Sequence, residues 1–382
     1  MALKINKRIG DITPNFNPRY FKEAYNNYKL GRVAKLVAMI EFAEIDSHVA
    51  GCLLGRDAGY KKEWSITPAS DNEQDVQIAE FFTEYFKSIG MRDLFEDIMD
   101  AKKKKFVVLE FENWDILKVG NQEKQVPTEI RKMHQKYFRL DTKDNNKLKI
   151  DDGNNLLDIP ETGGFPIVYK RNPIMLPVLR DFILKEFGVE SWAAFMETFG
   201  EPFIIGKYPP GSDAAFISQL EEAVNSLGAS SRGVAPMGSE IEIKESHRST
   251  GDHEKFAGYS DKGIAISLLG HANAVQQSST MQIGENLAPY KVKLELAVDD
   301  IYFIETQIQA LLRFLIIRNY AGVTKFPTFS IDKSEPINVK EFLLVLDQAY
   351  EQGMEVNPSE YAKLGMQVSD KQKPLSKTDL LD

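Results

Sequence analysis

The segment 285–320 most constrains what this chain can fold into, because its residue pattern predicts one continuous helix. At 1.5 Å per residue such a helix spans roughly 50 Å, much more than the usual helix of about three turns. A second long helix is predicted from Pro173 to Phe199, where apolar residues recur at helical spacing. Two such helices around a smaller insert favour a spoke-like arrangement over a ball.

The composition is that of a globular protein with no general affinity for polyanions. The 382 residues suggest two or three folding units, and the net charge of −9 gives no overall attraction to phosphates. The single cysteine, Cys52, excludes an intramolecular disulfide framework. The most apolar run, 310–317, is far shorter than the roughly 20 residues that cross a bilayer, and the first residues lack the apolar core of a signal peptide. We therefore expect a soluble intracellular protein without a membrane partner.

The first half of the chain is predicted to be mixed. Two prolines in a polar sequence suggest an extended arm over the first 35 residues. Ser70 to Asn72 offer an N-cap for a helix with a row of phenylalanines on its buried side. The remaining predictions are a helix at 33–54, a short strand at 63–68, a helix at 92–105 ending in four lysines, a strand at 106–111, and an antiparallel region at 115–172 with strands at 137–140, 147–150 and 165–169.

The second half is predicted to carry a small insert between the long helices. A strand at 202–208, a helix capped by Ser212 and an alternating strand at 239–245 form this insert. A helix at 253–269 and a polar stretch at 271–280 precede the long helix. Further helices are expected at 339–352 and 358–364, followed by a polar end.

Catalytic and metal-binding motifs find little support. The segment 200–207 has five residues between its glycines, and Tyr208 stands where a phosphate loop needs Ser or Thr. The pair His253 and Glu254 lacks the second histidine of a zinc-protease helix. Asp299 and Asp300 point about 100° apart on a helix, so we interpret them as a solvated face rather than an ion site. No cofactor or metal is predicted, and the chain is not expected to be an enzyme.

Two other interpretations stay open at this level. The basic block at 102–105, or Gly206 with Lys207, could serve a phosphate-handling enzyme of a mobile element. Capping the negative end of a helix explains the same lysines without a ligand. A structural adaptor without a channel is the remaining alternative.

One long segment resembles a known family. The run 191–208, SWAAFMETFGEPFIIGKY, is similar to the signature of the Mu-like phage portal proteins, in which a Trp-x-x-Phe-x-Glu-x-Phe-Gly-x-Pro segment precedes a Gly-Lys-Tyr strand. Weaker similarities follow in order at 234–242, 266–270 and 353–361. The resemblance implies a portal-type α+β fold with long stem and wing helices, a small α/β clip and a helical C-terminal crown. Its implied parts are an arm and wing at 1–172, stem helices at 173–200 and 247–269, a clip at 201–246, a tunnel loop at 270–284, a long wing helix at 285–330, and a crown and tail at 331–382.

The resemblance also implies a role and partners. Portal proteins form a ring of identical subunits, typically twelve, at one capsid vertex, through which double-stranded DNA passes without sequence specificity. The implied partners are terminase, the major capsid or scaffold protein and a head–tail connector, with the chain in the virion and, during assembly, in the host cytoplasm. The residues expected at the DNA channel are His271, Asn273, Gln276, Gln277, Ser278 and Ser279. Those expected at the clip and at subunit contacts are Trp192, Phe199, Pro202, Lys207, Tyr208, Glu240 and Glu242.

Overall fold

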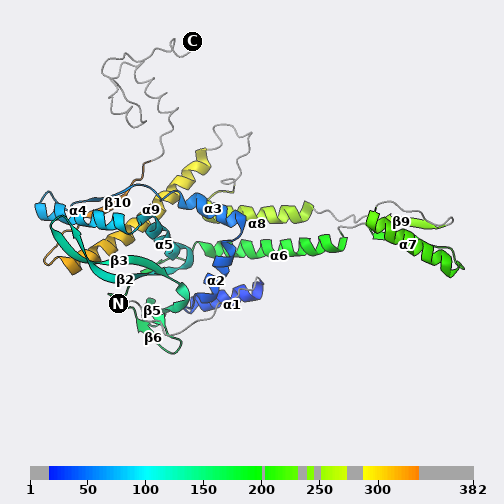
Figure 1. Cartoon of the computed structure of the whole chain (residues 1–382), viewed down its shortest axis with the longest axis horizontal. Coiled ribbons are helices and arrows are strands. Elements are labelled where there is room, and N and C mark those ends of the chain that lie inside the picture. The colour runs from blue at the N-terminus through cyan, green and yellow to red at the C-terminus, as the bar shows by residue number, and fades with distance from the viewer. Residues whose placement is uncertain (1–16, 200–202, 231–238, 245–250, 273–286, 335–382) are drawn as a thin grey trace, which may run out of the picture. The chain divides into compact units, whose positions relative to one another are not determined.

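The structure is a computed structural model that describes residues 17–199, 203–230, 239–244, 251–272 and 287–334 (Figure 1). The chain divides into two compact units, Met1–Ile331 and Asp332–Asp382, and every element described here belongs to the first. Helices and strands are mixed along this unit, as an α+β class requires. In chain order the elements are α1 (Pro18–Lys29), α2 (Ala34–Ala43), α3 (Ser47–Asp57), β1 (Trp64–Thr67), α4 (Glu73–Ser88), α5 (Met91–Lys104), β2 (Phe106–Val119), β3 (Gln122–Met133), a 3₁₀ turn (Gln135–Tyr137), β4 (Phe138–Asp141), β5 (Lys147–Asp151), β6 (Leu156–Asp158), β7 (Gly164–Val168), α6 (Met175–Phe199), β8 (Phe203–Lys207), α7 (Ala214–Ser230), β9 (Glu240–Lys244), α8 (Gly251–Leu269), α9 (Leu287–Asn319) and β10 (Thr328–Ile331).

The first described residues are helical, so the prediction of an extended arm is wrong for α1. The side-chain oxygen of Asn17 accepts a hydrogen bond from the backbone N–H of Tyr20 at 2.7 Å and caps the helix. Pro18 suits the first helical turn, because no intrahelical N–H is needed there. The proline that suggested an arm therefore starts a helix.

The single helix predicted at 33–54 is in fact two helices, α2 and α3. Asp46 separates them with an extended backbone, and its carboxylate accepts hydrogen bonds from the N–H groups of His48 and Val49 at 3.0 Å. An aspartate at this position satisfies N–H groups that a helix start leaves free. The apolar periodicity continues through the break, which is why the spacing alone did not reveal it.

The largest sheet has the strand order β3-β2-β7 and is antiparallel throughout. β2 runs well past the predicted 106–111: it pairs with β7 near Phe106 and with β3 as far as Val119. β3 lies within the antiparallel region predicted at 115–172, but it was not named as a separate strand, because its polar, charged sequence lacks a clear alternation. Helices α4, α5 and α9 pack on this sheet and complete the largest core, which includes Phe81, Phe82, Phe95, Phe111 and Ile308.

Two strands from near the beginning and the end of this unit pair with each other. β1 and β10 form an antiparallel pair in which Trp64 lies opposite Ile331. The indole of Trp64 stacks on Phe329, with ring centroids 5.7 Å apart. A separate sheet, β4-β5-β6, packs against α2 and confirms the strands predicted at 137–140 and 147–150.

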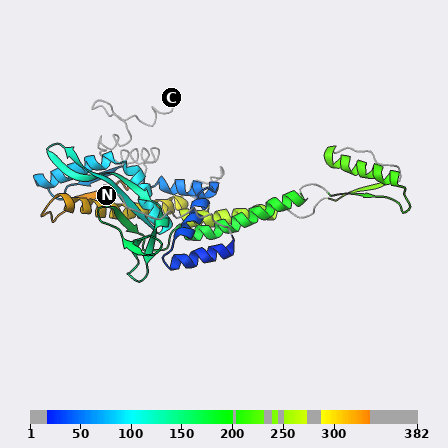
Figure 2. The same ribbon diagram turned by 60° about the horizontal axis from the view of Figure 1, so that its bottom comes forward.

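Helices α6 and α8 lie side by side in both views of the ribbon (Figures 1 and 2). Their bounds confirm the helices predicted at 173–199 and 253–269. One side of the pair is buried against α2 and α3, in a core that includes Leu179, Phe182, Ile264 and Leu268. α9, at 33 residues, confirms the long helix predicted at 285–320.

The insert between α6 and α8 has the expected strand–helix–strand order. β8 and β9 pair antiparallel from Phe203 opposite Lys244 to Lys207 opposite Glu240. Asp213, and not Ser212, caps α7: its carboxylate accepts from the N–H of Phe216 at 2.8 Å, whereas the Ser212 hydroxyl donates to a backbone carbonyl. The helices predicted at 339–352 and 358–364 lie outside the described residues.

Candidate subunit interface

The paired helices α6 and α8 expose several large apolar side chains to solvent. Phe187 on α6 is 62% exposed, and Tyr259 on α8 is 68% exposed. Single exposed apolar residues are ordinary on protein surfaces, but these two helices carry a group of them. A helix that is apolar on more than one side is usually buried on more than one side. The exposed members are Leu184, Phe187, Val189, Met196, Phe256, Tyr259 and Ile266.

A polar contact fixes this helix pair to α3. Lys185 of α6 pairs with Asp46 at 2.7 Å and with Asp261 of α8 at 2.9 Å. The ring nitrogen Nε2 of His48 lies 2.9 Å from the carbonyl oxygen of Asp261. Burial by itself raises the pKa of Asp46, but the hydrogen bonds from Lys185 and from the α3 backbone outweigh it and hold the pKa below its ordinary value. The exposed apolar side chains therefore lie on two helices that polar contacts fix to each other and to α3.

The predicted clip residues lie on the two-stranded sheet and next to it. Lys207 and Glu240 are cross-strand partners with Nζ 3.9 Å from Oε2, and both are exposed, so the pair contributes little to stability. Tyr208 follows β8 and is exposed. Within the described residues β8 and β9 pair only with each other, so each strand has one unpaired edge. Such edges are ready to pair with another chain.

The other predicted contact and channel residues are only partly described. Trp192 lies half-buried on α6. Phe199 ends α6 and Glu242 lies within β9, but their side chains lie outside the described part, as does all of Pro202. His271 is half-buried just beyond the end of α8. Asn273, Gln276, Gln277, Ser278 and Ser279 lie outside the described residues, so their place at a channel stays a prediction.

Three of the four lysines at 102–105 belong to buried ion pairs, and Lys105 donates to the carbonyl oxygen of Arg171 at 2.9 Å. Lys102 pairs with Asp300 of α9 at 2.6 Å and with Asp299, and Lys103 pairs with Asp57 at 3.0 Å. Lys102 and Lys103 are buried, and their ammonium groups already have carboxylate partners. The phosphate-site interpretation is therefore not supported by the geometry of these lysines.

The solvated-face interpretation of Asp299 and Asp300 is wrong for Asp300. Asp300 is completely buried and accepts two hydrogen bonds from Arg56 of α3, from Nε at 2.7 Å and from Nη2 at 2.9 Å. Burial on its own lowers the pKa of Arg56, and the hydrogen bonds to Asp300 more than offset it and raise the pKa above its ordinary value. No local pattern pointed to this pair, because Arg56 and Asp300 lie far apart along the chain.

Gly206 and Lys207 do not form a phosphate loop. Both lie in β8, where Gly206 is opposite Ile241 of β9. A Cβ at Gly206 would come within 2.9 Å of Val224 of α7, so the glycine is needed for close packing of helix on strand. The backbone is extended and paired, whereas a phosphate loop wraps its N–H groups around an anion.

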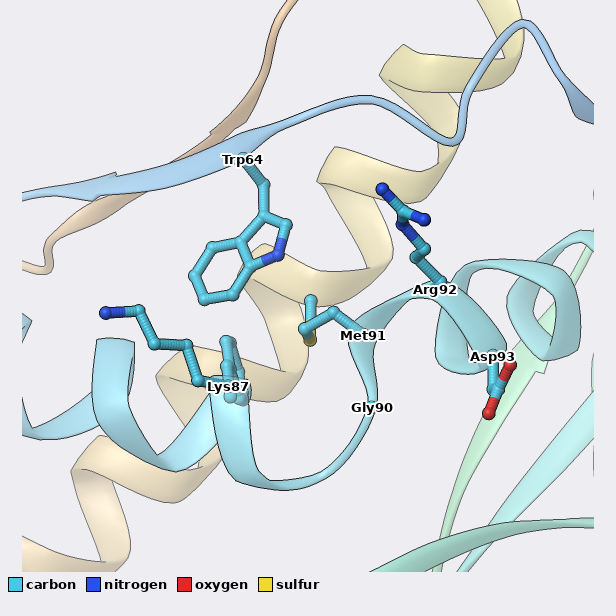
Figure 3. Close-up of a pocket in the computed structure, with 7 residues that line it drawn as sticks. Trp64, Lys87, Gly90, Met91, Arg92 and Asp93 are labelled. Carbon is cyan, nitrogen blue, oxygen red and sulfur yellow. The ribbon is translucent and has the colours of Figure 1, made fainter.

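A surface pocket of about 300 Å³ lies beside β1 and the turn between α4 and α5. Figure 3 shows Trp64 above Met91, with Lys87 and Arg92 on either side. Lys87 is paired with Glu84 at 2.8 Å. The lining consists of Trp64, Phe86, Lys87, Gly90, Met91, Arg92 and Asp93. None of these is a nucleophile next to a base, so the pocket does not have the make-up of an active site.

The part of the chain that the structure describes holds neither a metal site nor a membrane-spanning helix. There, no group of three or more His, Cys, Asp or Glu side chains is arranged to hold a metal ion. Over the same residues, every helix is too short or too polar to cross a bilayer.

The exposed apolar side of α6 and α8 was missed in the sequence. Its residues are mixed with those of the core on the same two helices, so the periodicity showed only that both helices are rich in apolar residues. The signal that could have revealed it is the excess of such positions: a single buried stripe would not need Phe187 and Tyr259 as well.

Comparison with known proteins gives the family. Residues 37–366 match the sequence model of the family described as portal protein of Mu bacteriophage. The chain is 26% identical over 273 residues to the portal protein of Escherichia phage Mu, covering 68% of this chain and 51% of that protein. It is 24% identical over 361 residues to the Mu-like prophage FluMu protein gp29 of Haemophilus influenzae, covering 87% of this chain and 67% of that protein. The chain thus spans about half the length of the phage Mu protein.

The fold agrees with this match. A chain in the neck of an empty gene transfer agent particle, computed with C6 symmetry, superposes with a TM-score of 0.55 over 93% of this chain and 96% of that one, at 11% identity. An identity this low shows a shared fold alone. Since the family match covers most of the sequence, this chain belongs to the family of Mu bacteriophage portal proteins.

Proposed function

We propose that this chain assembles with copies of itself into a ring, with about twelve subunits, that conducts double-stranded DNA at one vertex of a phage capsid. The single observation that carries the proposal is the exposed apolar side of α6 and α8, in a chain of a portal family. The neck location of a structurally similar chain supports a place in the neck of a virion. Portal proteins are structural, which supports the prediction that the chain is not an enzyme.

The physical argument for a ring rests on head-to-tail contact. An apolar surface on one subunit gains free energy when a neighbour covers it, at about 25 cal/mol per Å² of apolar area removed from water. When each subunit contacts its neighbour with a different surface, the contacts close into a ring if the rotation between subunits fits. The unpaired edges of β8 and β9 offer a second surface of this kind.

The subdomain roles are part of the same proposal. Residues 1–172 and 285–330 would form the wing, α6 and α8 the stem, and 201–246 the clip. The segment 270–284 would be the loop nearest the DNA, and 331–382 the crown. Terminase, the head shell and a head–tail connector are the proposed partners, with assembly in the host cytoplasm.

The charge of the chain agrees with a conduit that releases its DNA. Each Lys or Arg that contacts phosphate adds salt-dependent affinity, and a strongly basic lumen would hold DNA that must slide. The chain has a net charge of −9, and the residues proposed nearest the DNA are mostly uncharged amides and hydroxyls. Passage with few phosphate contacts is the expected result.

The purified chain is expected to form rings visible in negative-stain images. Its mass should lie near twelve times the 43.3 kDa of one subunit, measured by light scattering across a range of salt concentrations. A monomer at every salt and protein concentration would contradict the proposal. A closed assembly without a central channel would instead favour the structural adaptor.

Changing Gln276 and Gln277 together to lysine is expected to slow DNA packaging several-fold while leaving ring formation unchanged. New phosphate contacts in the lumen would resist sliding, and the effect should weaken as salt rises. Packaged DNA per particle, measured over time, is the readout. The matched control changes Gln74 and Asn121, both exposed on the proposed wing, to lysine. Equal packaging by both double variants would show that 276 and 277 do not face the lumen.

A further inference from the structure

The last turn of α8 is held by a side chain from another helix. A helix end leaves its final carbonyl groups without intrahelical partners. The carbonyl oxygen of Leu268 accepts a hydrogen bond from Nη1 of Arg56 at 2.7 Å. Gly270 then ends the helix with a φ of +75°, and its N–H donates to the carbonyl of Ile266 at 3.0 Å. Arg56 therefore fixes α8 at the point where the chain leaves it.

The same guanidinium is fixed on its other side by α9. Nε and Nη2 of Arg56 donate to the two carboxylate oxygens of Asp300. Arg56 is 5% exposed and Asp300 is fully buried, so water does not compete for these bonds. A planar guanidinium that uses three of its five donors on two helices has little freedom to move. The α8 end and α9 are thus joined through one side chain.

The charge of this cluster is balanced inside the protein. Lys102 of α5 donates to Oδ1 of Asp300 and to Asp299. Two cations therefore face two carboxylates, which a buried cluster needs because an unpaired charge in the interior is very costly. The cluster draws on α3, α5 and α9, and it reaches α8 through the Leu268 carbonyl.

Apolar packing brings the same two helices together beside the ionic cluster. A Cβ on Gly270 would lie 2.5 Å from Cγ1 of Val292, so α9 approaches the end of α8 closely. A Cβ on Gly59, just after α3, would lie 2.7 Å from Cβ of Ala297. The end of α8 therefore lies against α9 at Val292, and the end of α3 lies against α9 at Ala297, both within the helix that begins at Leu287.

We propose that Arg56, held by Asp300, is the positioning residue that fixes the end of α8, where the segment connecting α8 to α9 begins, against α9. It sets where the segment leaves α8 and ties that point to the helix at which the segment returns. Its consequence for DNA passage rests on the proposed function, in which this segment lies nearest the DNA. The positioning itself is a property of the chain and is testable on the chain alone.

The test is hydrogen–deuterium exchange of the full chain with Arg56→Lys. Lysine keeps the positive charge but has a single nitrogen, so it cannot serve Asp300 and the Leu268 carbonyl with the same geometry. The amides at 266–270 are expected to exchange about tenfold faster or more, since a hydrogen bond from a charged donor is lost. Exchange of the amides of α4 and β2 should change by less than about twofold. A global loss of stability would speed exchange there as well, so these amides distinguish local loosening from general destabilisation.

Two control variants show whether the effect is local. Asp299→Asn removes only the exposed partner of Lys102 and should leave exchange at 266–270 unchanged. Lys185→Gln removes the ion pairs that α6 makes with Asp46 and Asp261, and it should speed exchange near Asp46 and Asp261 only. If Arg56→Lys does not fold, the double variant Arg56→Gln with Asp300→Asn removes both charges together and should still speed exchange at 266–270.

Unchanged protection at 266–270, or equal loss over the whole core, would overturn the proposal. In a second experiment, rings of Arg56→Lys should form normally but package DNA more slowly than wild type. If this variant packages DNA normally although exchange at 266–270 is faster, Arg56 only holds the end of α8 against α9, and its proposed link to DNA passage is removed. Failure of the wild-type chain to form rings would count against the portal proposal and not against the position of Arg56.

Discussion

A chain with glutamate at both Phe187 and Tyr259 is expected to remain monomeric at micromolar concentration, where wild type is expected to form rings. Both side chains are mostly exposed in the single chain, so the change should not disturb the core. In the proposed ring a neighbour covers them, and burying a carboxylate without a partner costs several kcal/mol. The cost recurs at every interface, so the assembled fraction should fall by more than about 100-fold. Mass photometry or light scattering measures the outcome.

The matched control places glutamate at Ile116 and Leu157, which are exposed on β2 and β6. This control should form rings like wild type, and both double variants should keep the wild-type melting temperature. If the variant at Phe187 and Tyr259 forms rings of normal mass, the apolar side of α6 and α8 is not the subunit interface. A large fall in its melting temperature would instead mean that these residues support the single chain.

Asp300→Asn is expected to destabilise the chain by about 3–5 kcal/mol. The asparagine keeps the shape but removes the charge that neutralises Arg56 and Lys102, which are themselves buried. Two cations would then share a buried site with Asp299 as the nearest carboxylate. Thermal or urea unfolding measures the loss.

Asp299→Asn is the matched control, one residue away on the same helix. The side chain of Asp299 is 62% exposed and pairs only with Lys102, so its removal should cost less than about 1 kcal/mol. Equal losses for the two variants would show that burial at position 300 does not matter. If neither variant lowers the free energy of unfolding, the ionic cluster does not stabilise the chain.

Local signals in the sequence predicted most helices and several strands. The N-cap at Asn72, the apolar face of α4 and the length of α9 follow from neighbouring residues, and the structure agrees with them. The errors arose where two local signals conflict. Pro18 serves equally well in an arm or in a first helical turn, and the apolar rhythm across Asp46 hides the break between α2 and α3.

Contacts between residues far apart along the chain could not be predicted from the sequence. A buried pair such as Arg56 and Asp300 has no local pattern, because either residue alone looks like an ordinary surface charge. The four lysines at 102–105 could be read as an anion site or a helix end, and only their partners in the fold decide: the first three pair with carboxylates, and Lys105 donates to a backbone carbonyl. Similarly, the spacing of apolar residues on α6 and α8 does not show whether other parts of the same chain or a neighbouring subunit would cover them.

Because β1 pairs with β10, the first unit cannot be completed until nearly all of it has left the ribosome. At the usual rate of synthesis, β1 emerges roughly 10–50 seconds before β10. During that time β1 lacks its strand partner and the face of Trp64 that stacks on Phe329 is uncovered, and contacts between residues so far apart in sequence form slowly. A cell that makes many copies at once holds many such incomplete chains, each with an open strand edge. For this protein, the period of greatest risk of aggregation therefore falls during synthesis, before any subunit meets another.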